Sequence, residues 1–171
     1  KSFLNKHNNS RIKVLKDINI NIKSKEFVCI VGPSGCGKTT LMNMIGGLIK
    51  TEDQIIEFND NKQSFDDKFG YVFQTSRLLP WLTVKENVAL VCDGKPLKDE
   101  RIDEILENFG LKDFINYYPK SISGGMRRRV SLARAFINNP KVLLMDEPFV
   151  SLDQPTACLL YTSDAADESV R

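Results

Sequence analysis

One stretch decides the fold: Phe27-Val28-Cys29-Ile30-Val31, followed by Gly32-Pro33-Ser34-Gly35-Cys36-Gly37-Lys38-Thr39-Thr40. The apolar start predicts a buried strand, and residues 40–45 predict a helix that the next two glycines stop. The loop between them fits the phosphate-loop pattern G-x-x-x-x-G-K-[ST]. Inward-turned N–H groups and the start of a helix attract anions, so this stretch predicts a phosphate cradle. Lys38 would reach the β- and γ-phosphates, and the Thr39 hydroxyl would hold Mg²⁺.

Composition sets broad bounds on the protein class. The chain has 171 residues, which predicts one domain, and its net charge of +2 argues against a nucleic-acid partner. No apolar run reaches the roughly 18 residues of a membrane span, and the first residues form no signal peptide. The scattered cysteines predict a reduced, cytosolic setting, with Cys29 a small core residue. The lone histidine, His7, predicts a solvated loop side chain.

A second apolar run, Val142 to Met145, ends in Asp146 and Glu147. This pattern predicts a buried strand that delivers two acids to its C-terminal edge, where ligands of open α/β sheets bind. Asp146 is placed to hold the hydration shell of Mg²⁺. Glu147 points the other way and could orient and deprotonate the attacking water.

Between these motifs, Ser123-Gly124-Gly125-Met126 opens a helix predicted to run from Arg127 to Asn138. Ser123 is a good N-cap, and the two glycines leave backbone N–H groups bare, which predicts a second anion site. One nucleotide cannot readily use two such sites of one subunit, but a head-to-tail pair of subunits could supply one each. We interpret Arg127-Arg128-Arg129 as a solvated helix face, since no aromatic residues interleave.

At this point the chain resembles the ATP-binding subunit of an ATP-binding-cassette (ABC) transporter over about residues 1–157. The matching motifs occur in the family's order: Walker A at Gly32 to Thr40, the Q-loop at Tyr71-Val72-Phe73-Gln74, the signature at Ile122-Ser123-Gly124-Gly125-Met126, Walker B at Val142 to Glu147, and the D-loop at Ser151-Leu152-Asp153. The resemblance implies that Gln74 senses Mg²⁺ and the attacking water. It also places Phe3 where relatives carry an aromatic residue that stacks on adenine, although a core role for Phe3 stays open.

The resemblance implies an α/β fold of the P-loop NTPase (RecA-like) class: a parallel sheet flanked by helices, an N-terminal β region, and an inserted helical subdomain. The nucleotide-binding core would comprise residues 1–74 and 136–157, and the helical signature subdomain residues 75–135. Helical spacing of apolar residues over 101–109, ended by Gly110, supports that subdomain. Residues Arg77 to Val84, with the only tryptophan, Trp81, predict a surface for membrane subunits; packing within the subdomain is the alternative.

The implied function is ATP binding and hydrolysis that energises transport of a small solute. In this mechanism two subunits close over two ATP molecules, and Lys38, Gln74 and Glu147 carry the chemistry with Mg²⁺ held by Thr39, Gln74 and Asp146. Ser123, Gly124, Gly125 and Asp153 would contact the nucleotide of the twin subunit. The subunit would sit at the cytoplasmic face of the membrane with permease subunits and a solute-binding protein. Similarity to importers of nitrate, sulfonate and taurine suggests an anionic cargo, by analogy alone.

Two alternatives stay open: a soluble ABC ATPase of repair or translation, and a nucleotide-binding fragment without turnover. The chain also departs from the family in four ways. The turn Ser24-Lys25-Glu26 lacks the usual glycine, which predicts a conformation open to other residues, and Arg128 replaces a usual Gln. The family's switch histidine is missing, and residues 158–171 resemble a reading frame through a transposase-type sequencing adapter. We therefore expect a C-terminally truncated cassette with a non-native tail, poorly stable and inactive when isolated.

Overall fold

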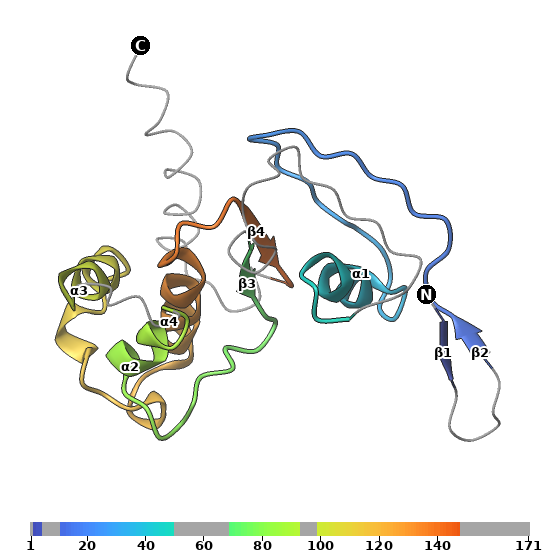
Figure 1. The fold of residues 1–171 in the computed structure, drawn as a ribbon. Helices are drawn as coiled ribbons and strands as arrows, with labels where there is room; N and C mark the ends of the chain where they lie inside the picture. The colour runs from blue at the N-terminus through green and yellow to red at the C-terminus, as the bar shows by residue number, and fades with distance from the viewer. Residues whose placement is uncertain (1, 5–10, 50–68, 93–98, 148–171) are drawn as a thin grey trace, which may run out of the picture. The chain divides into compact units, whose positions relative to one another are not determined.

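The protein is described by a computed structural model that covers residues 2–4, 11–49, 69–92 and 99–147 (Figure 1). These residues fall into two compact units, Lys1–Lys62 and Gln63–Arg171. The predictions for His7, for Asp153 in the D-loop and for the tail 158–171 lie outside the described residues.

The first unit holds a small sheet and one helix. Strand β1 (Ser2–Leu4) pairs antiparallel with β2 (Arg11–Lys13), and Phe3 lies opposite Ile12. Helix α1 (Lys38–Ile45) ends where predicted, because the N–H of its C-cap Gly46 bonds to the Met42 carbonyl at 2.8 Å. The strand pair agrees with the predicted N-terminal β region.

The prediction of a buried strand over residues 27–31 is wrong. The segment pairs with no strand among the described residues, and its side chains are exposed, with Val31 at 88%. Cys29 is exposed too, not the predicted core residue. The physical reason is that an apolar run becomes a buried strand only when a neighbour supplies hydrogen bonds and cover.

The turn before this segment also departs from its prediction. Lys25 has φ +63°, in the left-handed region that favours glycine. The turn keeps this conformation because the Glu26 carboxylate accepts a hydrogen bond from the Lys23 N–H at 2.7 Å. Lys25 therefore holds a backbone conformation that glycine would adopt without strain.

The second unit pairs two parallel strands, as the fold class requires. Strand β3 (Phe69–Val72) lies beside β4 (Val142–Met145), with Val72 opposite Met145. The β4 prediction is confirmed residue for residue. Helix α4 (Gly124–Phe136) packs against β3, and Gly70 permits this approach, because a Cβ there would lie 2.5 Å from the Ala135 carbonyl oxygen.

Three helices gather beside this strand pair (Figure 1). They are α2 (Val84–Ala89), α3 (Asp99–Asn108) and α4 (Gly124–Phe136), with short 3₁₀ turns at Lys112–Phe114 and Pro119–Ser121. Their shared core includes Val88, Leu106 and Val130, all fully buried. The helix predicted around residues 101–109 is confirmed, with Gly110 at φ +65° beyond its end. Among the described residues, no helix is long and apolar enough to cross a membrane.

Candidate functional site

The glycine loop of the first unit leads directly into α1. Gly35 and Gly37 have φ of +79° and +101°, which only glycine adopts without strain, and Gly37 is the N-cap of α1 with no side-chain cap. The Lys38 ammonium donates to the carbonyl oxygens of Gly32 at 2.7 Å and Pro33 at 2.9 Å. Lys38 is thus held at its own loop, on a helix start of the kind that binds phosphate.

The predicted residues of the second unit meet at one edge of its strand pair. Because β3 and β4 run parallel and end in register, the chain leaves both strands side by side. The Asp146 N–H continues the pairing by donating to the Val72 carbonyl at 2.9 Å. Just beyond, the Gln74 side-chain amide donates to a Glu147 carboxylate oxygen at 2.5 Å. Two motifs 73 residues apart in sequence therefore share one site.

Two acids at this edge differ in environment. Asp146 is buried, at 7% exposure, whereas Glu147 is exposed and has φ +49°. A left-handed, non-glycine residue is strained, and such strain concentrates at functional sites. Burial first, and the Asp146 charge second, raise the pKa of Tyr71 to about 12, while Arg77 opposes them.

The donor set at this edge suits Mg²⁺. The Asp146 carboxylate and the Gln74 amide supply the oxygen ligands that this ion prefers. Among the described residues, no cluster of three His, Cys, Asp or Glu side chains could hold a metal alone. Mg²⁺ typically takes one or two carboxylates together with nucleotide phosphates, and this set matches that pattern.

Ser123 caps helix α4 as predicted, but the helix runs from Gly124 to Phe136 and not from Arg127 to Asn138. The Ser123 hydroxyl caps it by accepting a hydrogen bond from the Met126 N–H at 3.2 Å. Ser123 and Gly124 are exposed, and a Cβ at Gly125 would find its nearest neighbour, the Ser123 hydroxyl, only at 4.0 Å. This helix start is open to a ligand or to another subunit.

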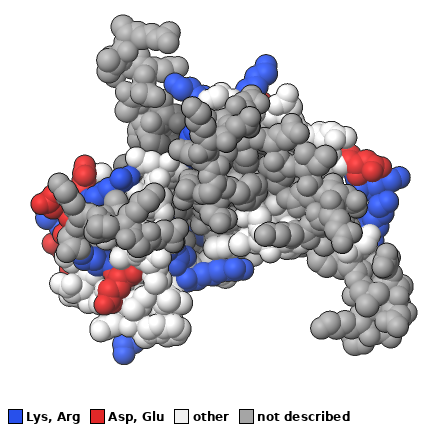
Figure 2. Space-filling model, in the orientation of Figure 1, with Lys and Arg blue, Asp and Glu red and all other residues white. Residues whose placement is uncertain are grey.

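The arginines of α4 are not the solvated face that the sequence predicts. Arg128 is buried, at 3% exposure, and Arg127 and Arg129 are half-buried. Their guanidinium groups donate to carbonyl oxygens of neighbouring loops: Arg127 to Pro119 and Ile122, Arg128 to Phe73, and Arg129 to Phe109. Sequence alone missed these contacts because a run of charges ordinarily faces water. Figure 2 shows acidic and basic side chains interspersed in the α3 region of the visible face.

Hydrogen bonds from two helices, α4 and α2, hold the segment after Gln74. Arg134 of α4 donates to the carbonyls of Ser76 at 2.9 Å and Arg77 at 3.0 Å. Asn87 of α2 is fully buried and bonds to the backbone of Leu79 through both its oxygen and its nitrogen. Trp81 nevertheless stays 68% exposed, which agrees with a surface position. Asn87 is buried in α2 together with Val84 and Val88, and charged residues of the same helix gave no hint of this in the sequence.

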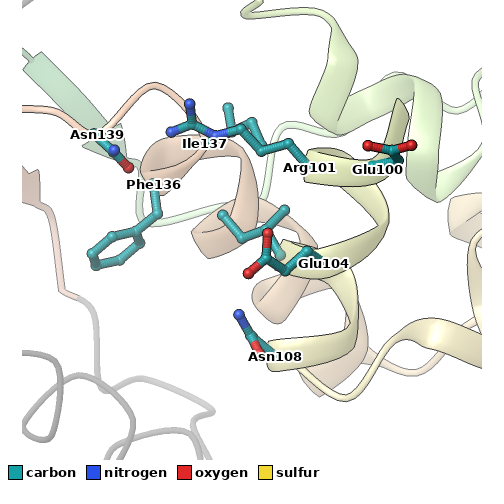
Figure 3. Close-up of a pocket in the computed structure, with 8 residues that line it drawn as sticks. Glu100, Arg101, Glu104, Asn108, Phe136, Ile137 and Asn139 are labelled. Carbon is teal, nitrogen blue, oxygen red and sulfur yellow. The ribbon is translucent and has the colours of Figure 1, made fainter. Parts of the chain in front are cut away.

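A separate surface hollow lies between α3 and the end of α4 (Figure 3). Its lining includes Arg101, Asn108 and Phe136, and none of its residues belongs to the predicted site. The sheet edge with Gln74, Asp146 and Glu147 is therefore the candidate site of this unit. For Phe3, the structure describes only its backbone position in β1.

Known proteins resemble this chain over most of its length. Residues 15–150 match the family described as ABC transporter. Aliphatic sulfonates import ATP-binding protein SsuB of Bacillus cereus is 46% identical over 83% of this chain and 57% of its own length. SsuB of Bacillus subtilis (strain 168) is 43% identical over 82% of this chain and 56% of its own. The chain thus spans little more than half the length of these relatives.

Other relatives carry different names. An import ATP-binding protein of Staphylococcus aureus (strain MRSA252), named provisionally for hemin (HrtA), is 42% identical over 86% of this chain and 73% of its own length. The dimeric post-hydrolysis structure of the ATP-binding cassette MJ0796, bound to ADP and Pi, superposes with a TM-score of 0.81. That match has 36% identity and covers 98% of this chain and 81% of the other.

Proposed function

The chain belongs to the ABC transporter family, and we propose that it is part of a longer ATPase subunit that drives import of a small solute. In this proposal, residues 1–74 and 136–157 form the nucleotide-binding core, residues 75–135 the helical signature subdomain, and residues 158–171 a non-native tail. The parent subunit works as a head-to-tail pair at the cytoplasmic face of the membrane.

The observation that carries the proposal is the contact between Gln74 and Glu147 beside the buried Asp146. A carboxylate whose orientation is set by an amide can hold a water molecule and accept its proton. The buried Asp146 carboxylate lies next to it. Asp146 does not activate water and supplies a metal ligand instead. This division of labour is what phosphoryl transfer to water needs.

The remaining site residues take the roles that their places permit. Gly32 to Thr40 cradles the phosphates of ATP, and Lys38 exchanges its bonds to the loop carbonyls for phosphate oxygens. Thr39, Gln74 and Asp146 would hold Mg²⁺, which would neutralise negative charge that develops on the phosphates. Ser123, Gly124, Gly125 and Asp153 complete the site of the twin subunit, and Phe3 stacks on adenine.

A pair of glutamate variants tests this function. Glu147→Gln in the parent protein should bind ATP normally and hydrolyse it at least about a hundredfold more slowly, because the general base is gone. Glu104→Gln, which neutralises an exposed glutamate of α3, is the matched control and should keep the wild-type rate. Lys38→Ala should weaken ATP binding. Equal turnover by Glu147→Gln and the control would refute the role of Glu147.

We propose that residues Arg77 to Val84 form the surface that contacts the permease subunits. Trp81 is exposed there, on a loop that hydrogen bonds from α2 and α4 hold in place. Trp81→Ala should leave folding and ATP binding unchanged and abolish co-purification with the permease subunits. Retained co-purification would overturn this assignment.

The proposed cargo is a small anion such as nitrate, a sulfonate or taurine. The proposal draws on relatives named for aliphatic sulfonates. Uptake of labelled sulfonate that depends on this locus supports it. Uptake of hemin instead, the cargo named for the Staphylococcus aureus relative, contradicts it.

A further inference from the structure

One buried arginine joins the two halves of the candidate site. The Arg128 side chain reaches from α4 to the loop after β3, where its Nη1 donates to the Phe73 carbonyl and lies 3.4 Å from the Gln74 carbonyl. Its Nη2 lies 3.4 Å from the carbonyl oxygen of Glu147, beyond β4. One guanidinium therefore contacts the backbone of both residues whose side chains meet at 2.5 Å.

Burying this charge has a cost that its surroundings must offset. Burial lowers the pKa of Arg128, and the negative charge of Asp146 opposes that shift. Its Nε has no hydrogen-bond partner within the described part of the chain, so the cation relies on its two Nη atoms and on the nearby acid. A planar fork can bond carbonyls of two segments at once, which a single ammonium cannot do as well.

We propose that Arg128 is a positioning residue for ATP hydrolysis, which fixes the backbones of Gln74 and Glu147 so that their side chains meet around the attacking water. The inference rests on the proposed ATPase function. Arg128 acts through these two residues, because its contacts are with their main chains. A small displacement of either loop separates amide from carboxylate, and catalysis is sensitive to errors of about 1 Å.

The neighbouring arginine is a matched control. Arg129 is on the same helix and donates to the carbonyl of Phe109 at 3.0 Å and, more weakly, to that of Gly110 at 3.5 Å. These acceptors belong to the turn after α3, not to the site. Replacing Arg129 removes similar bonds from a partly buried arginine without touching the Q-loop or Walker B segments.

The experiment compares Arg128→Met and Arg129→Met in the parent protein with its transport partners. Both variants should melt earlier than wild type, so ATP hydrolysis is measured at a temperature where circular dichroism shows each one folded. Arg128→Met should lower kcat about tenfold or more, with the KM for ATP within about twofold, as for losses of outer-shell support. Arg129→Met should keep kcat within about twofold. Arg128→Lys, which retains the charge and one donor group, should recover part of the loss.

Two results would overturn the inference while leaving the ATPase proposal intact. One is equal kcat in Arg128→Met and Arg129→Met; the other is a loss confined to KM.

A second measurement tests the positioning of Gln74 and Glu147 independently of ATP hydrolysis. Hydrogen exchange of the peptides containing residues 73–77 and 146–147 should rise in Arg128→Met and not in Arg129→Met, whether or not the wild type hydrolyses ATP. Absence of hydrolysis in the wild type would refute the ATPase proposal and, with it, any catalytic role of Arg128. Unchanged exchange in Arg128→Met would refute the positioning itself.

Discussion

Replacing Asn87 by alanine should loosen the loop that presents Trp81. The Asn87 side chain is fully buried and makes four hydrogen bonds to that loop. Its oxygen accepts from the Leu79 N–H at 2.8 Å. Its nitrogen donates to the carbonyls of Leu79 at 3.1 Å, Leu82 at 3.0 Å and Thr83 at 2.9 Å.

The size of the destabilisation depends on which backbone groups lose their hydrogen-bond partner. The Thr83 carbonyl keeps the backbone N–H of residue 87, and the Leu79 carbonyl keeps the N–H of Leu82. The Leu79 N–H and the Leu82 carbonyl lose the partner that the structure gives them. Each of these two backbone groups costs about 1–3 kcal/mol when it is left without a hydrogen-bond partner. Because water partly reaches the loop, we expect the free energy of unfolding to fall by about 3 kcal/mol.

The assay is urea unfolding of the parent protein, followed by far-UV circular dichroism. Acrylamide quenching of Trp81, the only tryptophan of this chain, reports on the loop itself and should increase, once any tryptophan of the parent protein outside these 171 residues is replaced by Phe. Asn138→Ala is the control, since that exposed asparagine donates a side-chain hydrogen bond to the Val91 carbonyl, and its loss should cost about 1 kcal/mol or less. A loss below about 1 kcal/mol for Asn87→Ala, or one equal to the control, would refute the reasoning.

Three further predictions concern the stability of the protein. Gly70→Ala should destabilise the protein by about 2 kcal/mol or more in the same urea assay, because its Cβ would lie 2.5 Å from the Ala135 carbonyl oxygen; a neutral effect would contradict the packing of α4 on β3. Lys25→Gly should stabilise it by about 0.5–1 kcal/mol, by relieving φ +63°, and a loss of stability would contradict that strain. Stability should fall as pH rises from about 10 toward 12, because the unfolded chain releases the Tyr71 proton before the folded one does. Tyr71→Phe should flatten that slope, and an unchanged slope would assign it to another group.

The sequence predicted the elements whose signals are local. Ser123 caps a helix because its hydroxyl accepts a hydrogen bond from an N–H three residues away, and β4 ends at Met145, where its apolar run ends. The meeting of Gln74 with Glu147 was implicit in the fold class, since parallel neighbours deliver their C-terminal ends to one edge. Such features need only a short window of sequence and one rule of topology.

The failures involve partners that are distant in sequence. The run 27–31 is apolar enough for a strand, but nothing in the run itself specifies which neighbour would pair with it and cover it. Arg128 reads as a solvated charge, yet its acceptor at Phe73 lies 55 residues away. Loop carbonyls carry no sequence signal, because every residue has one.

We propose that the terminal phosphate of ATP is bound between the Lys38 loop of one subunit and the Ser123 turn of another. Light scattering of the Glu147→Gln parent protein, with and without ATP, tests it most directly. We expect a dimer with ATP and a monomer without it, and loss of that dimer in Ser123→Arg although ATP still binds. An ATP-bound protein that stays monomeric, or a Ser123→Arg variant that pairs equally well, would contradict the claim.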